Sequence, residues 1–243
     1  MKSALMDVLN TCALAINEVV RAGTHGGFSG LRETQYHLDV AADEVALRVL
    51  LGAGYRVVSE ESGVTGEGEL TVVVDPIDGS TNCDHGVPFY ATSLGVLRDG
   101  ELIAGLVRNQ ATGTVYEAEV GAGATRDGEP ITVSGLTDFS RAVVAFSGLP
   151  SRHLGWSQYR ALGAASLEIC LVADGSLDAY CVARRSTLNP WDYLGGLLVL
   201  REAGGVASDF DDRELVTSAP ETRRPVFAAT TVLSSFLRNA GTI

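Results

Sequence analysis

The sequence predicts an α/β (α+β) protein of two lobes, and three observations support that prediction. Two stretches with apolar residues at helical spacing, 3–21 and 39–51, precede the first strand-like segment. Short β-branched segments separated by turn residues follow up to about residue 133, which is typical of an antiparallel meander. Strands and helices then alternate, which indicates a second lobe with a mixed sheet. We place the two lobes at residues 1–137 and 138–243.

The first lobe is expected to begin with two helices. Ser3 is a suitable N-cap for the first, and Gly52 and Gly54 close the second. The glycine-rich loop between them lacks a preceding strand and a GxGxxG pattern, so it is no dinucleotide fingerprint. The strands expected in this lobe are 55–59, 69–75, 90–97, 101–108, 114–119 and 131–133, with a glycine-rich loop at 62–68.

In the second lobe, the clearest helix spans 190–203. Pro190 lies near its first turn, and Gly204-Gly205 ends it. The segment 156–162 has no clear pattern. The other helices expected are 165–173 and 231–239, and the strands expected are 142–146, 177–182, 205–208 and 225–230.

The composition is that of an ordinary globular protein with a strongly acidic surface. Of the 243 residues, 46% are hydrophobic and 20% are charged, and the formal net charge is −12. Such a charge repels nucleic acid and anionic membranes, so we expect neither as a partner. The four cysteines form no CxxC pair, no apolar run reaches the length of a membrane span, and the first residues lack the apolar core of a signal peptide. We therefore expect a cytoplasmic protein.

The stretch 72–82 has the strongest chemical pattern of the chain. Three valines lead into Asp75, Asp78 follows three residues later, and Gly-Ser-Thr-Asn comes next. A buried strand would deliver these two carboxylates to its end, where they suit a hard cation. The backbone N–H groups of the turn that follows suit an anion such as phosphate. An ordinary Asp-Pro and Asp-Gly turn at the end of a strand explains this stretch equally well when it is taken alone.

Three further acids stand in or at the ends of other expected elements. Asp43 lies in the second helix, Glu60 follows strand 55–59, and Asp192 lies at the start of helix 190–203. Taken singly, an acid near a helix start suits the helix dipole. If the strands that end at Glu60 and Asp75 are neighbours, however, their carboxylates converge and repel each other unless a cation lies between them. Two or three divalent ions would offset the charges of all these acids, as in a multi-metal phosphoester site.

Together these motifs resemble the inositol monophosphatase family, within the larger group that includes fructose-1,6-bisphosphatases and 3′-phosphoadenosine phosphatases. The matching motifs are, in chain order, Ser59-Glu60-Glu61-Ser62, Asp75-Pro76-Ile77-Asp78-Gly79-Ser80-Thr81-Asn82, Pro190-Trp191-Asp192 and Glu202-Ala203-Gly204-Gly205. The resemblance implies a layered α-β-α-β-α sugar-phosphatase fold, with an antiparallel meander in the first lobe and a mixed sheet in the second. It also implies a Mg²⁺-dependent enzyme that acts on a small-molecule phosphate ester and forms a homodimer.

The resemblance further implies which residues would hold the metal. Glu60, Asp75 and the carbonyl of Ile77 would bind a first Mg²⁺. Asp75, Asp78 and Asp192 would bind a second, and Glu60 would help to hold a third. The expected cofactor is therefore two or three Mg²⁺ ions.

Catalytic and substrate-binding roles follow from the same resemblance. Asp43 and Ser80 would orient and deprotonate a metal-bound water, and Glu60 is the third residue expected to be catalytic. Ser80 stands where the family usually has a threonine, and a serine keeps the hydroxyl. The N–H groups of Gly79, Ser80 and Thr81 would hold the phosphate. The residues expected beside the substrate are Asp78, Gly163, Ala164, Ala165, Arg185 and Asp192.

The substrate itself is less well defined by the sequence. Asn82 favours the inositol and fructose phosphate branches. Arg185 stands seven residues before Asp192, where inositol monophosphatases usually carry a glutamate; it either clamps a second anion or is a surface residue of a variable loop. Arg32 either replaces a lysine of the family or reflects a shifted loop alignment. We expect a phosphomonoesterase for a small polyol or sugar phosphate, with a bisphosphate-specific enzyme such as fructose-1,6-bisphosphatase, or a non-catalytic binding or regulatory relative, as alternatives.

Overall fold

The computed structural model describes residues 3–23, 27–28, 30, 36–183 and 185–240. The first helix begins as expected, because the hydroxyl of Ser3 accepts the N–H of Met6 at 3.2 Å. None of the helices in the described ranges is both long and apolar enough to cross a membrane. The helices are α1 (Ala4–Ala22), α2 (His37–Gly52), α3 (Ser80–Asp84), α4 (Ala165–Ala173), α5 (Pro190–Glu202) and α6 (Thr231–Asn239), with a 3-10 turn at Phe139–Arg141.

The first sheet has eight strands in the order β2-β1-β3-β4-β5-β6-β7-β8. β1 and β3 are parallel, and from β3 onward each strand pairs antiparallel with the next, as the predicted meander requires. The strands are β1 (Arg56–Ser59), β2 (Gly63–Thr65), β3 (Leu70–Asp78), β4 (Ala91–Arg98), β5 (Glu101–Asn109), β6 (Val115–Glu119), β7 (Gly123–Arg126) and β8 (Glu129–Pro130).

The second sheet has five strands in the order β10-β9-β11-β13-β12. β9, β10 and β11 run parallel, whereas β13 is antiparallel to both β11 and β12, so the predicted mixed sheet is confirmed. The strands are β9 (Val143–Ser147), β10 (Gln158–Arg160), β11 (Ala179–Val182), β12 (Val206–Asp209) and β13 (Pro225–Ala228).

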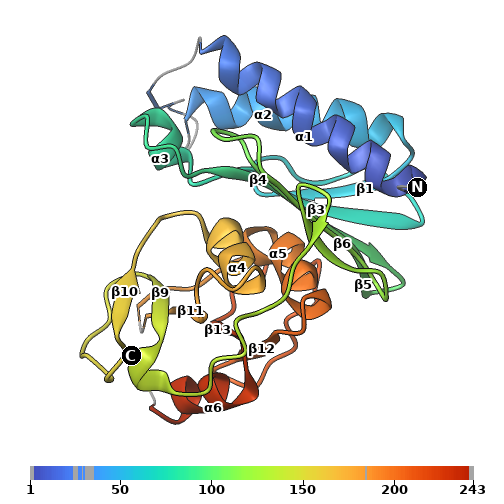
Figure 1. The fold of residues 1–243 in the computed structure, drawn as a ribbon. Coiled ribbons are helices and arrows are strands. Elements are labelled where there is room, and N and C mark those ends of the chain that lie inside the picture. The colour runs from blue at the N-terminus through green and yellow to red at the C-terminus, as the bar shows by residue number, and fades with distance from the viewer. Residues whose placement is uncertain (1–2, 24–26, 29, 31–35, 184, 241–243) are drawn as a thin grey trace.

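Helices and sheets alternate in five layers (Figure 1). α1 and α2 cover one face of the first sheet, α4 and α5 lie between the two sheets, and α6 lies on the far face of the second sheet. Each interface has its own cluster of buried apolar side chains, with the largest around α4 and α5. α5 is apolar on most of its surface, which suits a helix covered on both sides. The structure thus confirms the α-β-α-β-α layering.

Glycines allow α5 to pack directly on the backbone of the first sheet. A Cβ at Gly95 in β4 would lie 2.7 Å from Cβ of Leu194, and one at Gly105 in β5 would overlap the carbonyl oxygen of Gly195. No other residue type fits at this distance without displacing the helix. The close contact fixes where the first turn of α5, which includes Asp192, lies relative to the sheet.

Most predicted elements are confirmed with shifted ends, and several segments differ, among them 123–126, which forms the unpredicted strand β7. The predicted loop 62–68 contains β2, which pairs with β1 in a short hairpin. Residues 131–133 form no strand. The last strand of the meander is instead the two-residue β8, which ends at Pro130, a residue that cannot donate a backbone hydrogen bond. The unclear segment 156–162 contains the edge strand β10. Arg32 and most of the glycine-rich loop between α1 and α2 lie outside the described residues.

Candidate metal centre and active site

Glu60 and Asp75 lie close together because β1 and β3 are parallel neighbours. Ser59 pairs with Val74, and the N–H of Glu60 donates to the carbonyl of Val74 at 3.2 Å. The residues that follow these paired positions therefore leave the sheet side by side. The predicted neighbourhood of the two acidic strand ends is confirmed.

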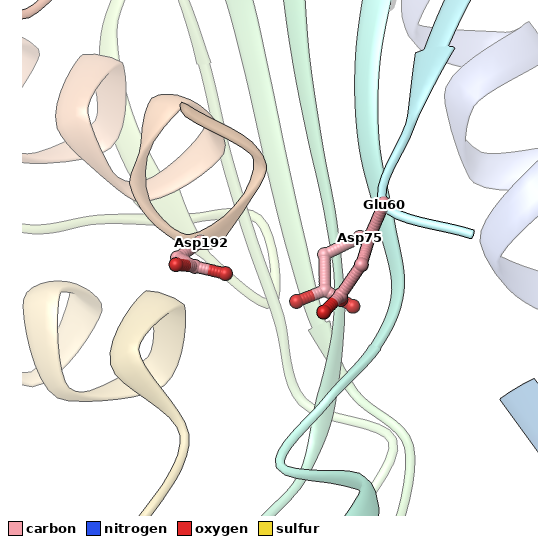
Figure 2. A group of neighbouring side chains, drawn as sticks. All are labelled: Glu60, Asp75 and Asp192. Atoms are coloured by element: carbon pink, nitrogen blue, oxygen red, sulfur yellow. The ribbon is translucent and has the colours of Figure 1, made fainter. Parts of the chain in front are cut away.

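Asp192 reaches the same place from α5. It is the third residue of the helix, and its carboxylate accepts the N–H of Asn189 at 2.7 Å in a capping box. Its carboxylate faces those of Glu60 and Asp75, which come from the sheet side (Figure 2). One carboxylate oxygen from each of the three lies within 4.8 Å of the others. Three of the predicted metal ligands, carried by three different elements, are thus brought together.

Burial and mutual repulsion raise the pKa values of this cluster. Asp75 is only 3% exposed, so burial raises its pKa well above the usual value, and the charges of Glu60, Asp78 and Asp192 raise it further. Burial, followed by the charge of Glu61, raises the pKa of Glu60 to about 7. Burial also raises the pKa of Asp192, with Glu60 and Asp78 as further causes. Without a counter-ion, the cluster must therefore retain protons at neutral pH.

The donor set fits a hard divalent cation. Oδ1 of Asp75 is buried and has no hydrogen-bond partner among the described residues. A buried carboxylate oxygen without a donor is costly, and three crowded carboxylates add repulsion to that cost. A cation bound by the three oxygens would remove both penalties, and carboxylate oxygens are ligands that Mg²⁺ prefers.

Asp78 lies beside this cluster but is held by α4. Its carboxylate accepts the N–H groups of Ala165 at 3.1 Å and Ser166 at 2.7 Å, and the hydroxyl of Ser166 at 2.5 Å. Burial raises its pKa to about 6, and these three donors limit the shift. In this arrangement the N–H groups at the start of α4 bind a side chain of the protein. Ala165, which is predicted to lie beside the substrate, contacts Asp78 in this way.

The backbone between Asp75 and Asp78 departs from regular pairing with β4. Asp75 pairs with Ser93 and Asp78 with Ala91, so the two residues between these acids lie opposite the single residue Thr92. The buried hydroxyl of Thr92 donates to the carbonyl of Pro76 at 2.8 Å and accepts from Gln110 at 2.6 Å. This contact fixes the peptide that precedes Ile77, whose carbonyl is a predicted metal ligand.

Asp43 and the phosphate loop lie on the α2 side of the first sheet. The buried carboxylate of Asp43 accepts a hydrogen bond from the hydroxyl of Ser59, the residue before Glu60. Gly79 has a φ of 85° and precedes α3, which begins at Ser80. A Cβ at Gly79 would lie 2.9 Å from the carbonyl oxygen of Gly163, so only glycine fits there.

A pocket of about 310 Å³ lies on the second-lobe side of the cluster. Asp78, Asp192 and Glu168 supply its charged lining, and Gly163 and Ala165 are among its other walls. Arg185 is exposed in a turn and does not line the pocket, and no other described arginine, lysine or histidine does so. The titratable side chains of the pocket wall are therefore acids, apart from Tyr180.

Two buried acids near the site are absent from the sequence-based set of site residues. Asp39 is 5% exposed, and burial raises its pKa to about 7. It lies four residues before Asp43 on α2, so the helical spacing of the two acids was a usable signal. Glu168 is 1% exposed, and burial raises its pKa to about 8. An acid in the middle of the otherwise apolar helix 165–173 was the corresponding signal for Glu168.

Comparisons with known proteins identify the family of the chain. The sequence model of the inositol monophosphatase family matches residues 29–239. A fructose-1,6-bisphosphatase/inositol-1-monophosphatase of Thermococcus kodakarensis is 34% identical over 209 residues, which cover 84% of this chain and 80% of the relative. An inositol-1-monophosphatase of Mesorhizobium japonicum is 35% identical over 178 residues, covering 65% of this chain and 64% of the relative.

Solved structures show the same fold. An inositol monophosphatase–fructose 1,6-bisphosphatase superposes with a TM-score of 0.85 at 27% identity, covering 98% of this chain and 99% of the other. An inositol monophosphatase from Anabaena superposes with a TM-score of 0.80 at 24% identity, covering 97% of this chain and 94% of the other.

Proposed function

The chain belongs to the inositol monophosphatase family and is a phosphoric monoester hydrolase, and we propose that it hydrolyses a small polyol or sugar phosphate with the help of Mg²⁺. The observation that carries the proposal is the convergence of Glu60, Asp75 and Asp192 around a buried oxygen of Asp75 that lacks a hydrogen-bond donor. A carboxylate cluster of this kind is suited to a cation and to little else.

We assign the metal to residues on both sides of the pocket. Glu60, Asp75 and the carbonyl of Ile77 would hold one ion. Asp75, Asp192 and Asp78 would hold a second. When bound, such ions would lower the pKa of a water and offset charge on the phosphoryl group.

The chain's own side chains orient the reactants. The carboxylate of Asp43 is fixed by the hydroxyl of Ser59, and we assign to it the acceptance of a proton from the attacking water, which Ser80 would help to orient. Ser80 begins α3 directly after Gly79, so its hydroxyl and the N–H groups of Gly79, Ser80 and Thr81 are the donors proposed for the phosphate. Glu60 would serve the reaction as a metal ligand beside Asp75.

The pocket favours an uncharged hydroxyl-bearing group on the substrate. Its lining contains acids and no described base, so its carboxyl groups can form hydrogen bonds with hydroxyls, whereas nothing in the lining offsets the charge of a second phosphate. Arg185 lies exposed and outside the lining, which supports its alternative role as a surface residue. A bisphosphate remains the second candidate, because relatives named for both activities are similar to this chain.

Phosphate release from three esters, each with Mg²⁺ and with EDTA, tests the proposal. We expect Mg²⁺-dependent hydrolysis of inositol 1-phosphate, slower hydrolysis of fructose 1,6-bisphosphate and 3′-phosphoadenosine 5′-phosphate, and little change in any rate on Arg185→Glu. Turnover that persists in EDTA would refute the metal assignment. A selective loss of bisphosphate hydrolysis in Arg185→Glu would instead identify Arg185 as the clamp for a second anion.

We also expect a homodimer in the cytoplasm that binds neither nucleic acid nor membranes, with lobes divided near residue 137. The strongly negative net charge supports the absence of anionic partners. Size-exclusion chromatography with light scattering would measure the oligomeric state directly.

A further inference from the structure

Glu168 is a fully buried acid of α4 that none of the roles above uses. The N-cap of this helix is Ala164, which has no side chain to cap the first turn. The carboxylate of Glu168 turns back and accepts the N–H of Leu162 at 2.9 Å. The backbone N–H groups of Gly163 and Ala164 also stabilise its charged form. Glu168 therefore holds the segment that precedes α4 through the N–H of Leu162.

The same segment is held from the other side by the loop that follows β3. The side-chain amide of Asn82 donates to the carbonyl of Leu162 and to that of Phe89, both at 2.8 Å. A Cβ at Gly163 would lie 3.1 Å from this amide nitrogen, so the side chain of Asn82 packs closely on the backbone of Gly163. Leu162 is thus bound at its N–H by Glu168 and at its carbonyl by Asn82.

The start of α4 and the loop 78–82 consequently form one bonded unit. Asp78 accepts the N–H groups of the first turn of α4, and Asn82 binds the segment before it. Glu168 is the only described carboxylate that both lines the pocket and bonds to this segment. A shift of 162–164 would therefore move the loop 78–82, which carries residues assigned to metal and phosphate.

We propose that Glu168 is a positioning residue, whose carboxylate holds the segment 162–164 against Asn82 and thereby fixes the phosphate-binding loop 78–82. This inference rests on the proposed function for the identity of the bound anion. The bonded unit itself rests on hydrogen bonds within the chain.

The test measures inorganic phosphate binding in the presence of Mg²⁺ by calorimetry, with Glu168→Gln, Asn82→Ser and the double variant. Glu168→Gln keeps the side-chain size but replaces one acceptor oxygen with a donor. We expect each single variant to weaken phosphate binding by up to about tenfold, as for the loss of one hydrogen bond that holds the segment. Because both substitutions act on one segment, the double variant should bind phosphate with about the affinity of the weaker-binding single variant.

Asp209→Asn is the matched control. Asp209 is 2% exposed in β12, at the far edge of the second sheet, and its carboxylate accepts the N–H groups of Asp211 and Arg224. We expect this variant to lower the melting temperature without changing phosphate affinity. If Glu168→Gln behaves in the same way, or if the two single effects multiply to about a hundredfold in the double variant, the positioning role is wrong.

Hydrogen exchange of the metal-free protein provides a readout that needs no ligand. Glu168→Gln should speed amide exchange in peptides that cover residues 78–84, whereas Asp209→Asn should not. If wild-type protein binds no phosphate, the proposed function fails, but faster exchange at 78–84 still supports the bonded unit. Unchanged exchange at 78–84 in Glu168→Gln overturns it whatever the outcome with phosphate.

Discussion

Replacing Asp75 with asparagine should have opposite effects on stability and on activity. Asp75 shares its site with Glu60 and Asp192, and oxygens of the three lie within 4.8 Å of one another. Asparagine keeps the shape of the side chain but removes its charge. In the metal-free protein, that removes repulsion. In the presence of Mg²⁺, it removes a ligand to both ions.

The size of the stability effect can be worked out from the geometry. Two unit charges 4.8 Å apart interact by about 3.5 kcal/mol at an effective dielectric constant of 20. Glu60 and Asp192 are partly exposed, and protonation already relieves part of the repulsion, so we take about 1–2 kcal/mol as the net gain. For a chain of this length, that corresponds to a rise in melting temperature of about 4 °C in EDTA.

The assay compares melting temperatures in EDTA and in Mg²⁺ with phosphate release. Asp75→Asn should melt higher than wild type in EDTA and show no further rise with Mg²⁺. Its kcat/KM should fall at least about a thousandfold, which is about 4 kcal/mol of transition-state stabilisation. Asp178→Asn is a control, because Asp178 is a buried acid that binds Ser134 and Val143. It should lower both melting curves and leave their separation unchanged.

The reasoning would be refuted by a variant that melts at or below the wild-type temperature in EDTA and still gains stability from Mg²⁺. That result would mean that the carboxylates do not repel one another and do not hold the ion. Near-normal turnover by Asp75→Asn would separately refute its assignment as a bridging ligand.

Three further predictions concern pH, packing and the strand irregularity. Folding raises the pKa values of Glu60 (to about 7) and Asp78 (to about 6), so their contribution to stability is present at low pH and is lost as the pH rises toward 7. The gap between the melting temperatures in Mg²⁺ and in EDTA should therefore widen over this range. A constant gap would contradict the prediction. Gly105→Ala should destabilise the protein in urea by about 1–3 kcal/mol, because the new methyl group overlaps α5. In the control Gly52→Ala the methyl group meets open space, so this variant should be neutral or stabilising. Equal stabilities of the two variants would show that α5 does not pack so closely on β5. Thr92→Val should lower the free energy of unfolding in urea by about 1–3 kcal/mol and weaken Mg²⁺ binding in calorimetry, because the carbonyl of Pro76 loses its donor. Thr92→Ser, which keeps the hydroxyl, should restore both. If it does not, the hydroxyl is unimportant.

The architecture was largely predictable because its signals are local. Apolar spacing identified α1 and α2, and turn residues separated the strands of the meander. The strands that were missed, β2, β7, β8 and β10, have two to four residues each, too few for a periodic pattern. Residues 131–133 carry β-branched side chains, yet β8 ends before them at Pro130. Whether such a short edge strand forms depends on its neighbours in the sheet and not on its own sequence.

The candidate site was predictable in part, for a different reason. The convergence of Glu60 with Asp75 could be inferred from two strand ends, but only if the strands were adjacent, and that adjacency is a property of the folded sheet. The contact of Asp78 with α4 depends on the hydroxyl of Ser166, which is a long-range partner that no local pattern reveals. Glu168 did have a local signal, an acid within an otherwise apolar helix, but that signal does not show which groups the side chain contacts.

The most direct test of the account is the position of a bound ion. Crystals soaked with Mn²⁺, which prefers the same oxygen ligands as Mg²⁺, would locate it by anomalous scattering. The account predicts an anomalous peak coordinated by carboxylate oxygens of Glu60, Asp75 and Asp192, and its loss in Asp75→Asn. Mn²⁺-dependent phosphate release by the same protein, with no peak among these three residues, would contradict the central claim.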